Sequence, residues 1–412
     1  MIRHLLKLVW KRKRSSALLT LEILISFLVL FGVGTLAATA ILRYRKPLGF
    51  DYNNVWVASV SFPQPLMVID ETLPLDQQLQ TRRAREAPYR ATLDRMMGEL
   101  RTFPQIESVA ASSAPAYSTS EWISGTTFNG HKVQMTRDGV TDGYGELMRI
   151  PLLRGRWFGP EDEGANVPPM IVDSDLARNM FGDADPLGQK FSFGEGDDFR
   201  IVGITAPFRK RGEFSQDKVQ MAFDRVELKG WRGGTPRELV IRVRPGTPAE
   251  FEETLTERLH ALAPDFQMRI RHMDSMRRSI NRIFLAPVIF GFIVSAFLIG
   301  MVALGLSGVL WQNVTRRRRE IGLRRALGAT GTSVHRQILI EVALLSTLAV
   351  IIGVLVIAQL PMLGLFQVVT PLAYGVGIGA ALATIYALTL LCGLYPSWLA
   401  GRVQPAEALH YE

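Results

Sequence analysis

The chain of 412 residues is 48% hydrophobic and 21% charged, with a formal net charge of +9 and a mean hydropathy of +0.14. One cysteine, Cys392, excludes a disulfide within the chain and a cysteine-based metal site, and six scattered histidines without HxxxH or HExxH spacing argue against a zinc enzyme. The excess positive charge lies beside the apolar segments, in residues 1–42 and 283–412, while residues 43–282 are neutral overall. A nucleic-acid-binding protein is instead expected to carry such charge on its folded domain.

The N-terminal segment, residues 1–16, is basic and amphipathic. Its apolar residues share one side of a helix, which suits a short interfacial helix on the cytoplasmic face of a membrane. A basic tail that only sets membrane topology is the alternative. The apolar residues of this stripe are Ile2, Leu5, Leu6 and Val9.

Residues 17–42 predict the first transmembrane helix, because about 20 apolar residues cross a bilayer. The apolar stretch is longer than the core of a signal peptide, and no convincing cleavage site ends it. Its one charged residue, Glu22, lies near the cytoplasmic end. We expect the carboxylate to reach towards the basic tail; a proton relay is the alternative.

Residues 43–282 alternate predicted strands and helices and form the large domain outside the membrane. One strand–helix–strand unit is expected at about 51–115 and a second at about 231–275, with an irregular insert at 116–230. The fold class is therefore a four-helix membrane protein with a large α/β extracytoplasmic domain, built from two βαβ-type, porter-like units and an inserted α+β subdomain.

The same domain shows local signals but no catalytic constellation. Thr247, followed by Pro248 and Glu250, has the spacing of a helix capping box. The acidic runs PEDE (160–163) and EGDD (195–198) fit solvated turns better than acid/base pairs. We therefore predict no catalytic, cofactor-binding or metal-binding residues.

Three further transmembrane helices are predicted at 283–311, 338–360 and 372–397. The last two come from a long uncharged run that Pro361 and Pro371 divide. A short outer loop (361–371) joins them, and residues 398–412 form the C-terminal tail. The helix DSMRRSINR is expected to continue directly into the second transmembrane helix.

The charge of the short flanks predicts the orientation. Basic residues precede the first transmembrane helix and fill the loop 312–337, whereas the loop 361–371 is uncharged. Both termini and the arginine-rich loop therefore face the cytoplasm, and residues 43–282 lie outside. The sequence RRRREIGLRRALGATG (316–331) can be explained by its arginines alone, because they are sufficient to set the membrane topology.

That sequence also resembles the signature of the FtsX-like, or MacB-like, permease family of ABC transporters, and HRQILIE continues the match. PLLRGRWFGPED and PMIVDSDLARNMFGDADPLGQKF are similar to the family's outer domain, and YPSWLAGRVQPAEALHYE is similar to its C-terminus. The resemblance implies that the loop is a coupling helix seated on an ATPase. Its residues are Arg317, Glu320, Ile321, Gly322, Leu323, Arg324, Arg325, Ala326, Leu327, Gly328 and Ala329.

The resemblance implies a permease subunit in a bacterial inner membrane. The sequence holds no G-x-x-x-x-G-K-[ST] phosphate loop, so ATP and Mg²⁺ are expected on a separate ABC ATPase subunit, and this chain is expected to be non-catalytic. ATPase closure would be relayed through the transmembrane helices to the periplasmic domain, to drive efflux or extraction of a periplasmic or membrane-embedded substrate. Further expected partners are a second permease copy or a paralogue, a periplasmic adaptor, an outer-membrane channel and membrane lipids.

Two alternatives stay open. One is a signalling member that regulates a cell-wall hydrolase or another periplasmic partner without transport. The other is a membrane-anchored receptor or enzyme without an ATPase, which the cytoplasmic motif disfavours. The sequence does not identify the substrate, or distinguish a homodimer from a heterodimer of permeases.

Overall fold

The computed structural model divides the chain into two compact units, one formed by residues 1–44 and 284–412 and the other by residues 45–283. We call the second unit the outer domain. The structure describes residues 13–63, 74–128, 131–192, 198–214, 220–228, 234–316, 323, 330–362 and 369–401.

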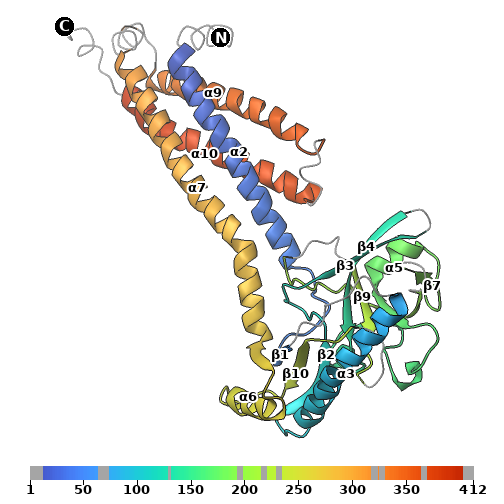
Figure 1. Cartoon of the computed structure of the whole chain (residues 1–412). Helices are drawn as coiled ribbons and strands as arrows, with labels where there is room; N and C mark the ends of the chain where they lie inside the picture. Colours follow the sequence, from blue (N-terminus) through green and yellow to red (C-terminus); the bar gives the residue numbers. More distant parts are fainter. Residues whose placement is uncertain are drawn as a thin grey trace. The chain divides into compact units, whose positions relative to one another are not determined.

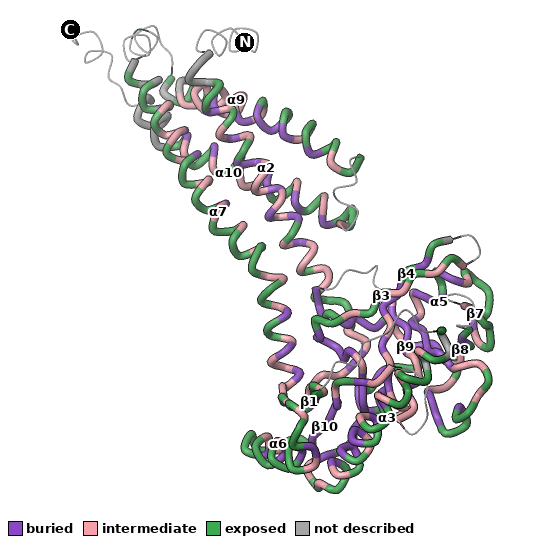
Figure 2. Tube along the Cα trace, viewed as in Figure 1, coloured by how far each residue is buried: buried purple, intermediate pink, exposed green. Residues whose placement is uncertain are grey.

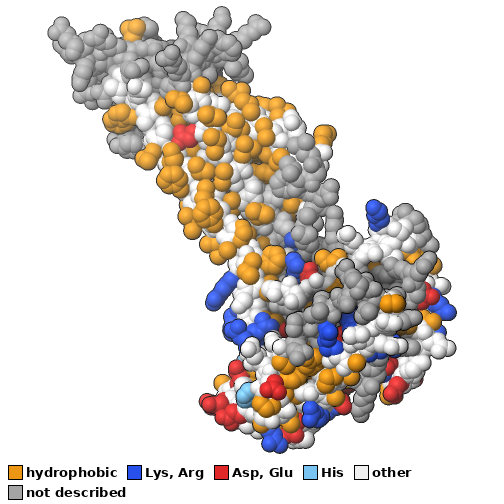
Figure 3. Space-filling view, viewed as in Figure 1, with side chains coloured by type: hydrophobic (Ala, Val, Ile, Leu, Met, Phe, Trp, Pro, Cys, Tyr) orange, Lys and Arg blue, Asp and Glu red, His pale blue; other side chains and the backbone are white. Residues whose placement is uncertain are grey.

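Among the described residues, four helices are long and apolar enough to cross a membrane, which confirms the predicted number (Figure 1). Large apolar side chains cover their visible surface, whereas charged side chains are spread over the outer domain (Figure 3). Residues 1–12 of the expected interfacial helix lie outside the described residues, and residues 13–16 belong to the first helix. The helices are α2 (Lys13–Tyr44), α7 (Met273–Arg316), α9 (Gly331–Gln359) and α10 (Pro371–Gly401).

The transmembrane helices are packed unequally. Helices α2, α9 and α10 pack closely against one another, and Gly377 of α10 approaches the backbone of α2 so tightly that a side chain there would meet Thr35. Helix α7 adds Val302, Leu306 and Leu310 to their shared core. In the most apolar stretch of α7 only 6% of the residues are buried, whereas the buried share is 33% in α2 and α9 and 22% in α10 (Figure 2). Helix α7 is therefore the most loosely held of the four.

The outer domain confirms the two strand–helix–strand units, but the units interleave in one sheet and do not form separate halves. The strand order is β11-β1-β10-β2, and every neighbouring pair is antiparallel. This is the order of a ferredoxin-like β-α-β-β-α-β fold with an insertion between its second and third strands. The elements are β1 (Val55–Ser61), α3 (Leu75–Leu100), β2 (Ile106–Ser112), β10 (Glu238–Val243), α6 (Phe251–Leu262) and β11 (Gln267–His272).

Both helices of this subdomain cover the same face of the sheet. Leu93, Met96 and Leu100 recur at helical spacing along α3 and are fully buried, as are Leu255 and Leu259 of α6. They join the sheet's inward-facing side chains in one apolar core. Burying this stripe stabilises the four strands against the helices by about 25 cal/mol per Å² of apolar surface.

The insert extends the sheet and has a core of its own. Its strand β4 pairs with β2 of the ferredoxin-like sheet, with Ser112 opposite Val140, and a separate apolar cluster fills the insert. Its strand order continues as β4-β9-β6-β8-β5, with β3 beside β4 and β7 beside β8. The elements are β3 (Trp122–Phe128), β4 (His131–Val140), α4 (Tyr144–Leu147), β5 (Leu152–Gly155), the 3₁₀ turn η1 (Pro160–Asp162), β6 (Pro169–Asp173), α5 (Ser174–Phe181), β7 (Lys190–Ser192), β8 (Asp198–Thr205) and β9 (Gln220–Arg225).

Two local predictions are wrong. Thr247 does not cap α6, because its hydroxyl donates to the carbonyl oxygen of Arg244 (2.7 Å) and the helix begins four residues later at Phe251. Asp162 of the PEDE run is buried and accepts two hydrogen bonds of 2.6 Å from the Arg156 guanidinium, although its neighbours Glu161 and Glu163 are exposed as predicted. Residues 195–197 of the second acidic run lie outside the described residues.

Asp173 is an N-cap whose loss should destabilise the insert. Its carboxylate accepts hydrogen bonds from the backbone N–H of Leu176 in α5 (2.7 Å) and of Met221 in β9 (2.9 Å). Asp173→Ala removes a cap and leaves a second N–H unpaired, so we expect a loss of about 2 kcal/mol. Faster hydrogen exchange in α5 and β9 of the full chain would report it. Thr247→Ala is the control, and an equal effect at that position would contradict the assignment.

Candidate functional site at the root of helix α7

The predicted coupling residues fall almost entirely outside the described residues. Leu323 alone is described; it is helical, and its side chain is 53% exposed. The structure therefore does not test their role. The residues outside are Arg317, Glu320, Ile321, Gly322, Arg324, Arg325, Ala326, Leu327, Gly328 and Ala329.

Helix α7 is continuous from the outer domain into its transmembrane stretch. It runs without a break from Met273 to Arg316, which corresponds to about 66 Å at 1.5 Å per residue. Met273, Met276 and Ile280 are buried within the outer domain, while residues after Arg282 are apolar. This confirms the prediction that DSMRRSINR continues into the second transmembrane helix. No flexible linker separates the two parts of α7.

An ion pair holds the first turns of α7 against the outer domain. The Arg277 guanidinium donates to the carboxylate of Glu213 at 2.5 Å and lies 4.7 Å from the centre of the Tyr52 ring. Partial burial alone would lower the pKa of Arg277, but the hydrogen bond and charge of Glu213 outweigh it and raise that pKa. Because Glu213 is buried, its carboxylate depends on this cation.

The loop that carries Glu213 also holds the chain that leaves α2. The backbone N–H of Arg209 donates to the carbonyl oxygen of Leu48 (2.9 Å), and its guanidinium donates to the carbonyl oxygen of Glu213 (2.7 Å). Gly49 has φ +81°, and a Cβ there would lie 2.2 Å from the carbonyl oxygen of Pro207. Only glycine fits this approach. One loop, residues 207–214, thus contacts both the segment after α2 and the first turns of α7, which we call the root of α7.

A buried arginine fixes the next residues of the entering chain. Arg242 of β10 is 2% exposed and donates to the carbonyl oxygens of Leu147 (2.6 Å), Asp51 (2.9 Å) and Asn53 (2.9 Å). Burial lowers the pKa of Arg242. The Asp51 carboxylate also pairs with Arg149 at 3.0 Å. Partial burial would raise the pKa of Asp51, but the Asn53 N–H and the charge of Arg242 lower it.

Two further buried charged groups, Lys210 and Asp138, lie near the place where the two parts of the sheet meet. Lys210 is buried and donates to the carbonyl oxygen of Ser120 (3.1 Å), and burial lowers its pKa. Asp138 accepts hydrogen bonds from the Ser112 hydroxyl (2.8 Å) and the Ala114 N–H (2.9 Å). Burial raises the pKa of Asp138 to about 6, although the charge of Lys210 opposes the shift.

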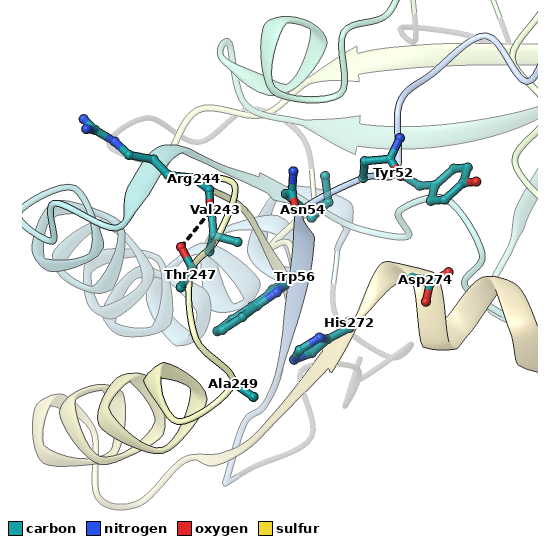
Figure 4. A pocket seen from close by; sticks show the side chains of 11 residues that line it. Tyr52, Asn54, Trp56, Val243, Arg244, Thr247, Ala249, His272 and Asp274 are labelled. Carbon is teal, nitrogen blue, oxygen red and sulfur yellow. Dashed lines mark hydrogen bonds between the residues drawn. The ribbon is translucent and has the colours of Figure 1, made fainter.

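A cavity of about 320 Å³ opens beside the root of α7 (Figure 4). The Trp56 indole stacks on the His272 imidazole with ring centres 4.5 Å apart, and Nε2 of His272 lies 2.9 Å from the Glu252 carboxylate. These contacts join β1, β11 and α6 but include no nucleophile with a positioned base. Within the described part of the chain, no cluster of His, Cys, Asp and Glu side chains could hold a metal ion.

No local pattern in the sequence pointed directly to Glu213, Arg277 or Arg242, because their partners come from distant segments. One signal was available for Arg242: a charged residue inside a strand that is otherwise apolar needs a buried partner. For Arg277, the signal was its position just before an uninterrupted transmembrane helix.

Together, the four apolar helices and the ferredoxin-like outer domain with its insert define a multi-pass membrane protein whose outer domain lies between the first two transmembrane helices in the sequence. Residues 16–258 match the family described as MacB-like periplasmic core domain, and residues 292–405 match the FtsX-like permease C-terminal family. The chain belongs to this MacB-like, FtsX-like permease family, as its motifs predict.

Curated relatives are about one quarter identical to the chain. The macrolide export ATP-binding/permease protein MacB of Chlorobaculum tepidum is 27% identical over 293 residues, which are 67% of this chain and 43% of that protein. The pyoverdine export ATP-binding/permease protein PvdT of Pseudomonas aeruginosa is 24% identical over 284 residues, 66% of this chain and 41% of that protein. The chain therefore spans less than half the length of these relatives.

Among solved structures, the periplasmic region of MacB from Actinobacillus actinomycetemcomitans aligns with 57% of this chain and 94% of its own, at 15% identity and a TM-score of 0.37.

Removing the ion pair at the root of α7 should loosen both segments that the loop holds. Arg277→Ala leaves the Glu213 carboxylate buried without its cation, which costs about 3 kcal/mol. We expect faster hydrogen exchange at residues 46–53 and 273–281 of the full chain in detergent micelles. The control is Arg278→Ala, which removes an exposed ion pair with Asp274 worth at most about 0.5 kcal/mol. Equal exchange in both variants would refute the role of the pair.

Proposed function

We propose that this chain is the permease subunit of an ABC transporter complex that drives efflux or extraction of a periplasmic or membrane-embedded substrate. The observation that carries the proposal is helix α7. It is fastened to the outer domain through Arg277 and runs without a break to Arg316, where the family's arginine signature begins. A helix fastened in this way passes a displacement at one end to the other.

The unequal packing of the transmembrane helices supports this relay. Helix α7 makes few contacts with the bundle of α2, α9 and α10, but its root is held by a buried carboxylate. A rigid-body shift of α7 would therefore break little apolar contact in the membrane and would pull directly on the loop 207–214. Such shifts of packed helices are a common form of conformational change.

We propose that the driving force comes from an ABC ATPase on a separate polypeptide, which binds ATP and Mg²⁺. The names of the relatives combine an ATP-binding and a permease function, which supports an ABC ATPase as the source of the driving force. The residues Arg317 to Ala329 would form the helix that seats on it. Apolar Ile321, Leu323 and Leu327 would make the contact, and the arginines would face the contact rim and the lipid headgroups.

The remaining partners follow from the same proposal. The chain would lie in the inner membrane with both termini in the cytoplasm, as the basic flanks favour. It would pair with a second permease, either a copy or a paralogue. A periplasmic adaptor and an outer-membrane channel would receive the substrate. The relatives named for macrolide and pyoverdine export support export as the direction of transport.

The coupling helix can be tested separately from topology. Leu323→Asp and Leu327→Asp would each place an unpaired carboxylate in the ATPase contact, which costs several kcal/mol unless the contact opens. We expect both variants to insert with normal topology but to lose the ATPase in affinity purification. Cysteine labelling from outside spheroplasts checks the topology in a Cys392→Ser background.

Arg317→Gln, which lies outside the proposed apolar contact, is the control and should retain the ATPase. If the two Asp variants retain it as fully as this control, the arginine cluster sets topology only.

A further inference from the structure

One carboxylate of the transmembrane helices has no partner. Glu22 of α2 is half-buried, and it makes no hydrogen bond or ion pair with any residue that the structure describes. Glu341 of α9, by contrast, accepts a hydrogen bond from the side chain of Gln337 (3.4 Å). Ionisable side chains are rare in membrane segments, and those that occur usually pair with another group and serve a function. Glu22 therefore needs a partner.

The Glu22 carboxylate lies against helix α7, which runs beside α2 (Figure 1). Gly305 of α7 has no side chain, and a Cβ placed there would lie 2.8 Å from one carboxylate oxygen of Glu22. The side chain of Leu19, one turn earlier on α2, borders the same place at 3.3 Å. Glycine at position 305 thus leaves room for the carboxylate where the two helices meet.

Both helices place this contact just inside one end of their apolar runs. Glu22 follows Ala17 by five residues, and Gly305 precedes Trp311 by six. At 1.5 Å per residue these separations correspond to about 7 and 9 Å along the helices. A charged head group can reach this depth while the apolar part of the same molecule stays in the hydrocarbon, as long basic side chains do near helix ends.

The apolar runs themselves supply no cation for Glu22. Residues 17–42, 283–315, 337–359 and 371–401 contain no Lys, Arg or His. An ionised carboxylate that is removed from water is stable only with a cation or with hydrogen-bond donors beside it. A cation on another molecule would meet this requirement.

Such a molecule can reach the carboxylate from the lipid. Only 6% of the most apolar stretch of α7 is buried, so little of the protein covers the contact. Leu21, next to Glu22, is 51% exposed, and Leu304, next to Gly305, is 77% exposed. These two leucines offer an apolar surface directly beside the unpaired charge.

We propose that Glu22 binds the positively charged head of a membrane-embedded amphiphile, an ammonium group joined to an apolar body, where α2 meets α7. The ammonium group pairs with the carboxylate, and Leu21 and Leu304 contact the apolar body. A free amphiphile and an ethanolamine lipid both carry this chemistry. The inference rests on the proposed function, because it gives the membrane-embedded substrate of that function a chemical class.

Fluorescence quenching in the full chain tests the pairing without ATP or an ATPase. Leu304→Cys in a Cys392→Ser background would carry a bimane fluorophore in nanodiscs of phosphatidylglycerol, a lipid without an ammonium group. The charged probe is a dodecylammonium with a nitroxide beside its charge, and the neutral probe carries the same nitroxide on a dodecyl amide. We expect Glu22→Gln to reduce quenching by the charged probe several-fold and to leave quenching by the neutral probe unchanged.

Glu341→Gln on α9 is the matched control, and it should leave quenching by both probes unchanged. Replacing part of the lipid by phosphatidylethanolamine distinguishes the sources: displacement of the charged probe identifies a lipid head group, and retention identifies a free amphiphile. Equal quenching by the charged probe in the parent chain and in Glu22→Gln would overturn the proposal. A chain that binds the probe through Glu22 but exports nothing would keep this site and contradict the proposed transport.

Discussion

The ion pair between Glu213 and Arg277 is the contact on which the link between outer domain and membrane helix depends. A buried carboxylate without its cation is costly, so the pair forces the first turns of α7 to stay against the loop 207–214. The same loop holds the backbone after α2 and, through Lys210, the junction between the ferredoxin-like sheet and its insert. A force on α7 would therefore act on the outer domain through this loop as well as through β11, which continues directly into α7.

The interleaved sheet reinforces this arrangement. The chain enters the outer domain through β1 and leaves it through β11, and these two strands are direct neighbours, with Trp56 opposite His272. The two connections to the membrane helices therefore emerge from adjacent strands. If the two strand–helix–strand units formed separate halves of the outer domain, each connection to a membrane helix would act on its own half. Because they share a sheet, a relative shift of α2 and α7 would act across a single ladder of hydrogen bonds.

Local patterns in the sequence predicted the transmembrane helices, because each is a long apolar run. They also predicted the amphipathic stripe of α3 and the two strand–helix–strand units, because helices and strands repeat at 3.6 and two residues. The strand–helix–strand units interleave through contacts between residues that are far apart in the chain, and the ion pairs also join distant residues. No local pattern records such contacts. At Thr247 a local pattern was present but misleading. Its spacing fits a capping box, but its hydroxyl already donates to the carbonyl oxygen of Arg244 in the preceding turn. The coupling residues 317–329 were identified by resemblance, and apart from Leu323 they lie outside the described residues.

In the proposed mechanism, α7 acts as a rigid relay between its cytoplasmic end and the outer domain. Ser279, Arg282 and Ile283 are exposed on α7 just after Arg277, so replacing all three by glycine should soften the helix by about 3 kcal/mol relative to alanine without disturbing the ion pair. In the complex with the co-purified ATPase, ATP should change hydrogen exchange in the loop 207–214 of the triple-alanine variant. We expect the complex with the triple-glycine variant to bind ATP normally and to lose this change. An unchanged response in the glycine variant would contradict it.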